Sequence, residues 1–290
     1  MVIARITSGL GNQLFQYALG RHLANTNQTS LYLDLSYYRQ TYDTDTLRLF
    51  KLDRFATDYR LLNTSPLVYA SKLTRLLPNR TLKPLAAYVK EPHFHVDPSV
   101  QQARAAMVIL DGFWQSERYF ASSAGVLRRE LTFRRTPGPA FENFRRQIAS
   151  AAVPVSVHIR RGDYVNHPEF SQSFGFLGLE YYERALAQLL TRFPGATFFV
   201  FSDEPAWVAA NLPLHSPHVF VQNTGLDADV DDLQLMSLCH HHIIANSSFS
   251  WWGAWLNPRP DKVVLAPQHW FRNKPDWDTV DLIPDTWARV

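Results

Sequence analysis

Several short stretches of the chain alternate hydrophobic and polar residues with the two-residue period of a β-strand. The clearest is VPVSVHIRRGD, residues 153–163, in which Val155, Val157 and Ile159 alternate with Ser156 and His158. Strand patterns also cover residues 2–6, 31–35, 107–110, 197–201, 218–221, 242–245 and 262–265. Helical spacing of hydrophobic residues covers residues 140–151, 179–193 and 229–239, and segments that begin near residues 13 and 250. Because strands alternate with helices, the pattern predicts parallel sheets joined by right-handed crossovers.

A length of 290 residues favours about two domains, and the composition changes at residues 137–139, Pro-Gly-Pro. We therefore expect an α/β protein of two Rossmann-like lobes with a cleft between them. The N-terminal lobe would span residues 1–150 and the C-terminal lobe residues 151–290. The first lobe contains an irregular insertion, residues 40–105, in which only patches near residues 67–77 have helical spacing.

Composition narrows the class of protein. Hydrophobic residues make up 46% of the chain and the net charge is only +3, so we expect a large core and no nucleic-acid partner. Cys239 is the single cysteine, which excludes an intrachain disulfide and fits a reducing compartment. The N-terminus lacks a signal-peptide pattern, and no apolar run approaches about 18 residues. We expect a cytoplasmic protein, with peripheral contact at the inner face of a membrane left open.

A glycine-containing motif follows the first strand pattern. Residues 8–13, SGLGNQ, lie between that strand and a helical pattern, as at the start of a Rossmann unit. A dinucleotide fingerprint would need a third glycine where Leu14 stands, so the nucleotide signal is weak. We expect Gly11, Asn12 and Gln13 to line the mouth of a cleft beside a ligand. The alternative for Asn12 is that its side chain caps the following helix.

Two other strand ends of the first lobe carry candidate ligand contacts. Asp34 lies at the end of the second strand pattern, and Asp111, Trp114 and Gln115 follow the strand at residues 107–110. Because ligands of open α/β sheets bind at the carboxyl ends of strands, these side chains are candidates for contact with a sugar. The alternative for Trp114 is a place in the hydrophobic core.

Two adjacent arginines end the clearest strand pattern. Arg160, Arg161 and Asp163 would project from the carboxyl end of that strand. The planar, permanently charged guanidinium group suits phosphate or carboxylate, so we infer an anionic ligand with reactive chemistry nearby. A network of arginine and aspartate that serves only the fold stays open as the alternative.

Two further strand ends of the second lobe could bind the same ligand. Asp203 follows the strand at residues 197–201, and its carboxylate could bind guanine or cap the next helix. Residues 246–250, NSSFS, place Ser247 and Ser248 at a helix start, where backbone N–H groups and the helix dipole favour phosphate. An ordinary serine cap is the alternative there. Together the three strand ends describe a site for a nucleoside diphosphate.

The sequence gives little support for a metal site. Residues 43–45 and 227–229 match the bare D-x-D of metal-dependent sugar transferases, but acidic residues at 227–229 also favour a helix start. His240, His241 and His242 are consecutive, and neighbours in a strand point to opposite faces. We therefore expect no metal and no other cofactor.

Five motifs together resemble family 11 of the glycosyltransferases, the α-1,2-fucosyltransferases, in their compact bacterial form. They are SGLGNQLFQYALG (8–20), DGFWQSERYF (111–120), HIRRGDYV (158–165), FSDE (201–204) and ANSSFSWWGAWLN (245–257). The resemblance spans nearly the whole chain and is weakest over residues 40–105. It implies a GT-B-like fold with the acceptor on the N-terminal lobe and GDP-fucose on the C-terminal lobe. It further implies inverting transfer of L-fucose from GDP-β-L-fucose to the 2-hydroxyl of a galactose, without a metal.

The resemblance also implies roles for individual residues. It assigns Arg160 to the donor diphosphate, and His158 and Asp203 to the guanine side. It assigns the phosphate-binding helix start to Ser247, Ser248 and Phe249.

The catalytic base does not follow from the family pattern. Related fucosyltransferases of other families carry a glutamate a few residues after the arginine motif, and Glu169 lies near that place. A carboxylate near the cleft would suit the deprotonation of a sugar hydroxyl, so Asp163 is our first candidate and Glu169 the second. The alternative for Asp163 is that it only orients the arginines.

The expected partners are GDP-fucose and a galactose-containing glycan, and a lipid-linked acceptor would bring the protein to a membrane. Two other functions stay open. One is transfer of another GDP-sugar or to another hydroxyl, because guanine and diphosphate look the same whatever the sugar. The other is a non-catalytic protein that binds carbohydrate or nucleotide. The sequence predicts no oligomeric state.

Overall fold

The computed structural model describes residues 1–39, 48–62, 85–134, 137–166, 168–272, 274 and 277–290. The helical patches expected near residues 67–77 and the D-x-D motif at residues 43–45 lie outside these ranges. The chain forms two compact units. Unit 1 comprises Met1–Arg134 and Asp278–Leu282, and unit 2 comprises Arg135–Trp277 and Ile283–Val290.

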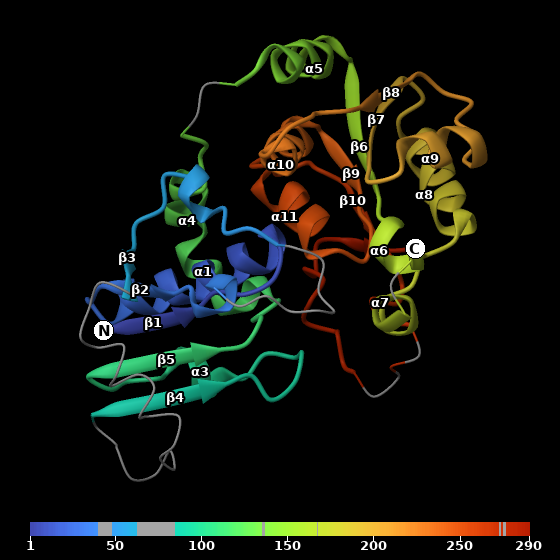
Figure 1. Ribbon diagram of the computed structural model, residues 1–290. Coiled ribbons are helices and arrows are strands. Elements are labelled where there is room, and N and C mark those ends of the chain that lie inside the picture. Colours follow the sequence, from blue (N-terminus) through green and yellow to red (C-terminus); the bar gives the residue numbers. More distant parts are fainter. Residues whose placement is uncertain (40–47, 63–84, 135–136, 167, 273, 275–276) are drawn as a thin grey trace. The chain divides into compact units, whose positions relative to one another are not determined.

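Unit 1 contains a five-stranded parallel sheet in the order β3-β2-β1-β5-β4 (Figure 1). Its strands are β1 (Val2–Arg5), β2 (Leu31–Asp34), β3 (Arg60–Leu61), β4 (Ala86–Lys90) and β5 (Met107–Asp111). The helices among its described residues are α1 (Leu10–Thr26), α3 (Pro98–Gln101) and α4 (Ala124–Glu130), with short 3₁₀ turns η1 (Ser36–Arg39), η2 (Leu52–Arg54), η4 (Glu117–Tyr119) and η5 (Ala121–Ser123). The expected irregular insertion is therefore not irregular throughout, because β3, β4 and α3 lie within residues 40–105.

Unit 2 contains a six-stranded parallel sheet in the order β11-β10-β9-β6-β7-β8. Its strands are β6 (Val153–Ile159), β7 (Ala196–Ser202), β8 (His218–Val221), β9 (His241–Ile243), β10 (Val264–Ala266) and β11 (Ala288–Arg289). Its helices are α5 (Pro139–Ser150), α6 (Gly162–Asn166), α7 (Pro168–Ser173), α8 (Leu179–Arg192), α9 (Pro205–Asn211), α10 (Ala228–Leu238) and α11 (Ser248–Leu256).

Alternating side chains of the central strands bury both faces of the unit 2 sheet. Val155, Val157 and Ile159 of β6 pack into one hydrophobic cluster with residues of α8 and α9. On the other face, Phe199 and Phe201 of β7 pack with residues of α5 and α10. Figure 1 shows α8 and α9 on one side of this sheet and α10 and α11 on the other. Such two-sided burial is typical of parallel sheets, and it leaves the strand ends for function.

The position of α5 differs from the sequence-based division. We expected the first lobe to extend to residue 150, which would include α5. In the structure α5 belongs to unit 2, because Phe141 and Ile148 of this helix are buried in the cluster that contains Phe199 and Phe201.

Candidate functional site

The register of β6 and β7 brings two predicted site segments together. Ile159 pairs with Ser202 at the carboxyl ends of the two parallel strands. The residues that follow, Arg160 and Asp203, therefore lie side by side, and Arg160 Nη1 is 3.1 Å from Asp203 Oδ2. This edge of an open α/β sheet is where ligands bind.

Asp203 holds the backbone of the arginine loop. Its Oδ1 accepts a hydrogen bond from the Arg161 N–H at 3.0 Å, and its Oδ2 accepts one from the Gly162 N–H at 3.0 Å. A Cβ atom on Gly162 would stand 2.8 Å from Oδ2, so the close approach requires glycine here. Asp203 does not cap α9, because Glu204 occupies the N-cap position and makes no side-chain cap bond.

Arg161 is fixed by two neighbours of its own. Its guanidinium group forms an ion pair with Glu204 and lies 4.1 Å from the centre of the Trp207 ring. Its side chain stays 21% exposed, and that of Arg160 stays 22% exposed. An arginine–carboxylate network therefore exists, in which the described carboxylates are Asp203 and Glu204, and both arginine side chains stay partly exposed. Whether Asp163 takes part, as the sequence-based alternative expected, stays a prediction.

His158 lies beneath this edge, on the face of the sheet that α11 covers. It is buried, and its ring centre is 5.5 Å from that of Phe249. Burial, together with the charge of Arg160, lowers the pKa of His158 to about 3. Its Nδ1 is buried and has no hydrogen-bond partner among the described residues. The ring is therefore neutral and keeps one polar atom uncommitted.

Ser247 caps α11, as the alternative interpretation expected. Its hydroxyl accepts a hydrogen bond from the Phe249 N–H at 3.4 Å. The preceding Asn246 is buried and donates to the carbonyl groups of Phe174 and Trp270, each at 3.2 Å. Ser248 is the first residue of α11, so backbone N–H groups at the positive end of a helix follow β9. Capping and phosphate binding are compatible, because the hydroxyl uses only one of these N–H groups.

Both candidates for the base lie in short helices next to this edge. The backbone of Asp163 is in α6 and that of Glu169 is in α7. Their side chains lie outside what the structure describes, so both assignments stay predictions.

In unit 1 the structure corrects two of the predicted ligand contacts. Gln13 is fully buried, its Nε2 donates to the carbonyl groups of Ser8 and Leu49, and its Oε1 accepts from the Lys51 N–H. Trp114 is 1% exposed and belongs to the core, with a left-handed φ of 59°. Both side chains serve the fold rather than face a ligand.

The other predicted contacts in unit 1 make hydrogen bonds within the unit. Gly9 is the N-cap of α1, so Gly11 and Asn12 lie inside the first turn, and Asn12 is not the cap. Asn12 Oδ1 accepts a hydrogen bond from Gln115 Nε2 at 2.8 Å. Asp34 is buried and accepts one from the Ser36 N–H at 2.9 Å.

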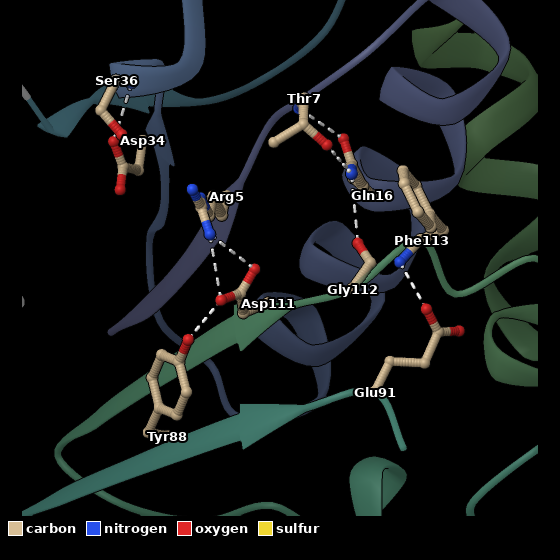
Figure 2. Close-up of polar contacts among 10 residues, drawn as sticks. All are labelled: Arg5, Thr7, Gln16, Asp34, Ser36, Tyr88, Glu91, Asp111, Gly112 and Phe113. Carbon is tan, nitrogen blue, oxygen red and sulfur yellow. Dashed lines mark hydrogen bonds and ion pairs between the residues drawn. The ribbon is translucent and has the colours of Figure 1, made fainter. Parts of the chain in front are cut away.

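Asp111 lies at the centre of a polar cluster at the carboxyl edge of the unit 1 sheet. Arg5 Nη1 contacts both of its oxygens, at 3.1 and 3.2 Å, and the Tyr88 hydroxyl donates to Oδ2 (Figure 2). Arg5 and Tyr88 were not among the candidate residues that the sequence pattern indicated. Arg5 is the last residue but one of the strand pattern at residues 2–6, as Asp34 is of the pattern at residues 31–35, so the same rule could have identified it. Tyr88 falls in the stretch without a regular pattern.

Glu91 and Gln16 fix the turn that follows Asp111. Glu91 accepts hydrogen bonds from the N–H groups of Phe113 and Trp114, at 2.6 and 2.9 Å, and burial raises its pKa. Gln16 Nε2 donates to the Gly112 carbonyl and to the Thr7 hydroxyl, as Figure 2 shows. Three strand ends are thus tied together around Asp111.

The described residues show no sign of a metal site or of a membrane-spanning helix. They contain no group of three His, Cys, Asp or Glu side chains that could hold a metal ion. His242 bonds Ser156 and Asn257, whereas the His241 ring stacks on Phe193, so these neighbours do point to opposite faces. Within the same residues no helix has the length and hydrophobicity to cross a membrane.

Comparison with known proteins identifies relatives over the full length. An alpha-1,2-colitosyltransferase of Escherichia coli is 33% identical, and the alignment covers 100% of this chain and 99% of that protein. The O-antigen biosynthesis glycosyltransferase WbnK of Escherichia coli is 31% identical over 98% of this chain and 99% of its own. A galactoside 2-alpha-L-fucosyltransferase of Caenorhabditis elegans is 24% identical over 68% of this chain and 57% of its own length.

Solved structures show the same fold. The fucosyltransferase NodZ from Bradyrhizobium has a TM-score of 0.56 at 16% identity, covering 89% of this chain and 92% of its own. NodZ alpha-1,6-fucosyltransferase soaked with GDP-fucose gives a TM-score of 0.52 at 15% identity, with coverage of 92% and 94%. The two parallel-sheet units therefore form a GT-B-like fold. The profile of glycosyl transferase family 11 matches residues 1–278, so the chain belongs to this family of glycosyltransferases.

Proposed function

We propose that the protein transfers L-fucose from GDP-β-L-fucose to the 2-hydroxyl of a galactose in a glycan, with inversion and without a metal. The observation that carries this proposal is the arginine loop after β6, which Asp203 holds at the sheet edge beside the N-terminus of α11. A full-length relative that is named an alpha-1,2-colitosyltransferase supports it, as does the likeness to NodZ.

The main electrostatic task of the site in this reaction is to stabilise the negative charge that develops on the leaving group. The acceptor oxygen forms a bond to the anomeric carbon while the bond from that carbon to the diphosphate oxygen breaks. The electron pair departs with GDP, whose diphosphate gains negative charge. Arg160, Arg161 and the N–H groups at the start of α11 stabilise that charge, because they are oriented before the reaction.

The remaining roles follow from the same edge. His158 is neutral and donates or accepts one hydrogen bond with the nucleotide through its uncommitted Nδ1. Asp203 positions Arg160 and keeps one acceptor position of Oδ1 for guanine. The proton of the acceptor hydroxyl goes to a carboxylate, Asp163 or, second, Glu169. Comparing the pH–rate profiles of Asp163→Asn and Glu169→Gln separates the two, and loss of activity only in the second variant reverses this order.

Colitose is the second candidate for the transferred sugar. The Escherichia coli relative at 33% identity is named an alpha-1,2-colitosyltransferase. Colitose is L-fucose without its 3-hydroxyl group, so the two GDP-sugars share their guanine, diphosphate and most of the pyranose ring. The donor-side contacts described above bind both equally, and discrimination must come from contacts with the sugar.

A direct assay tests the proposal. The protein is incubated with GDP-fucose or GDP-colitose and with lactose and related β-galactosides, with and without EDTA, and the product linkage is determined by NMR. We expect an α-1,2-linked fucosyl product that forms equally well in EDTA. Preference for GDP-colitose would show that colitose, and not fucose, is the transferred sugar. A requirement for a divalent cation would overturn the metal-free mechanism. Binding of GDP without turnover would indicate a non-catalytic binding protein.

A further inference from the structure

The carboxyl edge of the unit 1 sheet carries a polar cluster formed by Arg5, Tyr88 and Asp111. Arg5 ends β1, Asp111 ends β5, and Tyr88 comes from the neighbouring β4. Figure 2 shows the three side chains converging above the strand ends. The side chain of Arg5 is 30% exposed and that of Asp111 is 19% exposed, so a solute can reach both. Strand ends of this kind are where open α/β sheets bind ligands.

The hydrogen-bonding capacity of the cluster is not used up. Asp111 Oδ2 accepts from Arg5 and Tyr88, whereas Oδ1 accepts only from Arg5, which leaves one acceptor position. Arg5 uses a single nitrogen, Nη1, and its Nε is buried without a partner among the described residues. In Figure 2 its other terminal nitrogen points away from Asp111. The buried Nε is out of reach of a solute, so the cluster offers Asp111 Oδ1 as an acceptor and the other terminal nitrogen of Arg5 as a donor.

A second half-buried arginine in the same unit, Arg21, shows what a purely structural pair looks like. Arg21 bonds Glu130 through Nε and Nη2, and Asn25 through Nη1, so all three of its nitrogens are engaged. The contrast with Arg5 argues that the Arg5–Asp111 pair does more than tie β1 to β5. The partly exposed Arg5 side chain keeps a terminal nitrogen that makes no hydrogen bond to the described residues, whereas every nitrogen of Arg21 is used.

We infer that Arg5, Tyr88 and Asp111 form the binding site for the acceptor sugar, taking two adjacent hydroxyl groups of a neutral pyranoside. Asp111 Oδ1 accepts a hydrogen bond from one hydroxyl, and Arg5 donates to its neighbour. Tyr88 holds the carboxylate, and Glu91 and Gln16 fix the turn behind it. The carboxylate disfavours a phosphate or a sugar acid at this place. The inference rests on the proposed function for the identity of the sugar as a galactoside.

Arg5→Lys is the sharpest test, because lysine keeps the positive charge beside Asp111 and removes the uncommitted guanidinium donors. We expect the acceptor KM to rise about tenfold, the equivalent of one or two neutral hydrogen bonds, while kcat and the KM for the donor stay near wild type. Arg21→Lys is the matched control, and we expect it to lower the unfolding temperature and leave the acceptor KM unchanged. Asp111→Asn repeats the test if Arg5→Lys does not fold.

Binding of the sugar alone separates this inference from the proposed function. Saturation-transfer NMR with methyl β-galactoside and no nucleotide reports on the acceptor site whatever the donor is. We expect the signal in wild type and in Arg21→Lys, and a much weaker signal at the same galactoside concentration in Arg5→Lys. If no GDP-sugar is used but this pattern holds, the proposed function fails and the sugar site stands. An Arg5→Lys protein that is folded, binds the galactoside and keeps the wild-type acceptor KM would overturn the inference.

Discussion

Replacing Asp203 with alanine tests whether this residue holds the arginine loop. The substitution removes two hydrogen bonds to backbone N–H groups, each 3.0 Å long, and an ion pair of 3.1 Å. The side chain is 23% exposed, so water replaces part of what is lost, and each interaction contributes about 1 kcal/mol at most. We therefore expect a loss of about 2–3 kcal/mol in the stability of unit 2. For a unit of this size the unfolding temperature falls by roughly 4–10 °C.

The same substitution removes the ion pair that positions Arg160, so we expect a large loss of transfer activity in protein that is still folded. We expect transfer to drop by about 10²-fold or more, because a leaving-group contact is no longer oriented. Differential scanning calorimetry and a transfer assay below the unfolding temperature measure the two effects. Asp261→Asn is the control, since this carboxylate pairs with Arg259 at an exposed site and should change neither quantity.

A wild-type unfolding temperature in Asp203→Ala, combined with lost affinity for GDP, would refute this reasoning. Asp203 would then act on the nucleotide and not on the loop.

Three further predictions follow from single contacts. Arg160→Ala should fold normally and lose about 10²–10³-fold in transfer rate, measured with saturating substrates, and near wild-type turnover would contradict its role. Gly112→Ala places a Cβ 2.4 Å from Glu91 Cβ and should destabilise unit 1 by about 1–3 kcal/mol in urea unfolding, whereas the open site of Gly138 should accept alanine at little cost. His158, whose pKa falls from 6.5 to about 3, stays neutral in the fold but takes a proton in the unfolded chain. Stability is therefore lost as the pH falls below 6.5, by about 2 kcal/mol between pH 7 and pH 5. His158→Gln should lack this part of the loss, and equal acid sensitivity in both proteins would contradict burial of a neutral ring.

The donor-side strand ends were predictable because their signals are local. Alternation over residues 153–159 predicts β6 with its observed end at Ile159, and the strand expected at residues 218–221 coincides with β8. Two arginines directly after a strand, Arg160 and Arg161, indicate a candidate anion site from the local sequence alone. The parallel sheets of the two α/β lobes likewise follow from the alternation of strand and helix patterns, and the GT-B-like arrangement was implied by the family resemblance.

The partners of these residues were not predictable, because they depend on contacts distant in sequence. Arg161 and Asp203 are 42 residues apart, and no local rule indicates that Asp203 bonds the loop in place of capping α9. Gln13 looks like a ligand contact until its bonds to Leu49 and Lys51 are known. Short strands could not be predicted either, because a strand of two residues such as β3 is too short to show an alternating pattern.

Unit 1 shows the limit most clearly. Trp114 is a plausible sugar platform by sequence, yet its left-handed φ and its burial place it in the core. Arg5 is partly exposed and keeps a terminal nitrogen without a bond to the described residues, but by sequence it is less conspicuous than the SGLGNQ motif that follows it. Which polar group is already satisfied is a property of the packed structure, and it decides between a structural and a binding role.

The central claim is that the arginine loop and the start of α11 bind a guanosine diphosphate without help from a cation. Isothermal titration calorimetry of GDP into the protein in EDTA tests it most directly. We predict saturable heat with one site per chain, and a loss of at least tenfold in affinity in Arg160→Ala. Absence of heat in wild type, or heat that appears only when a divalent cation is added, would contradict the claim.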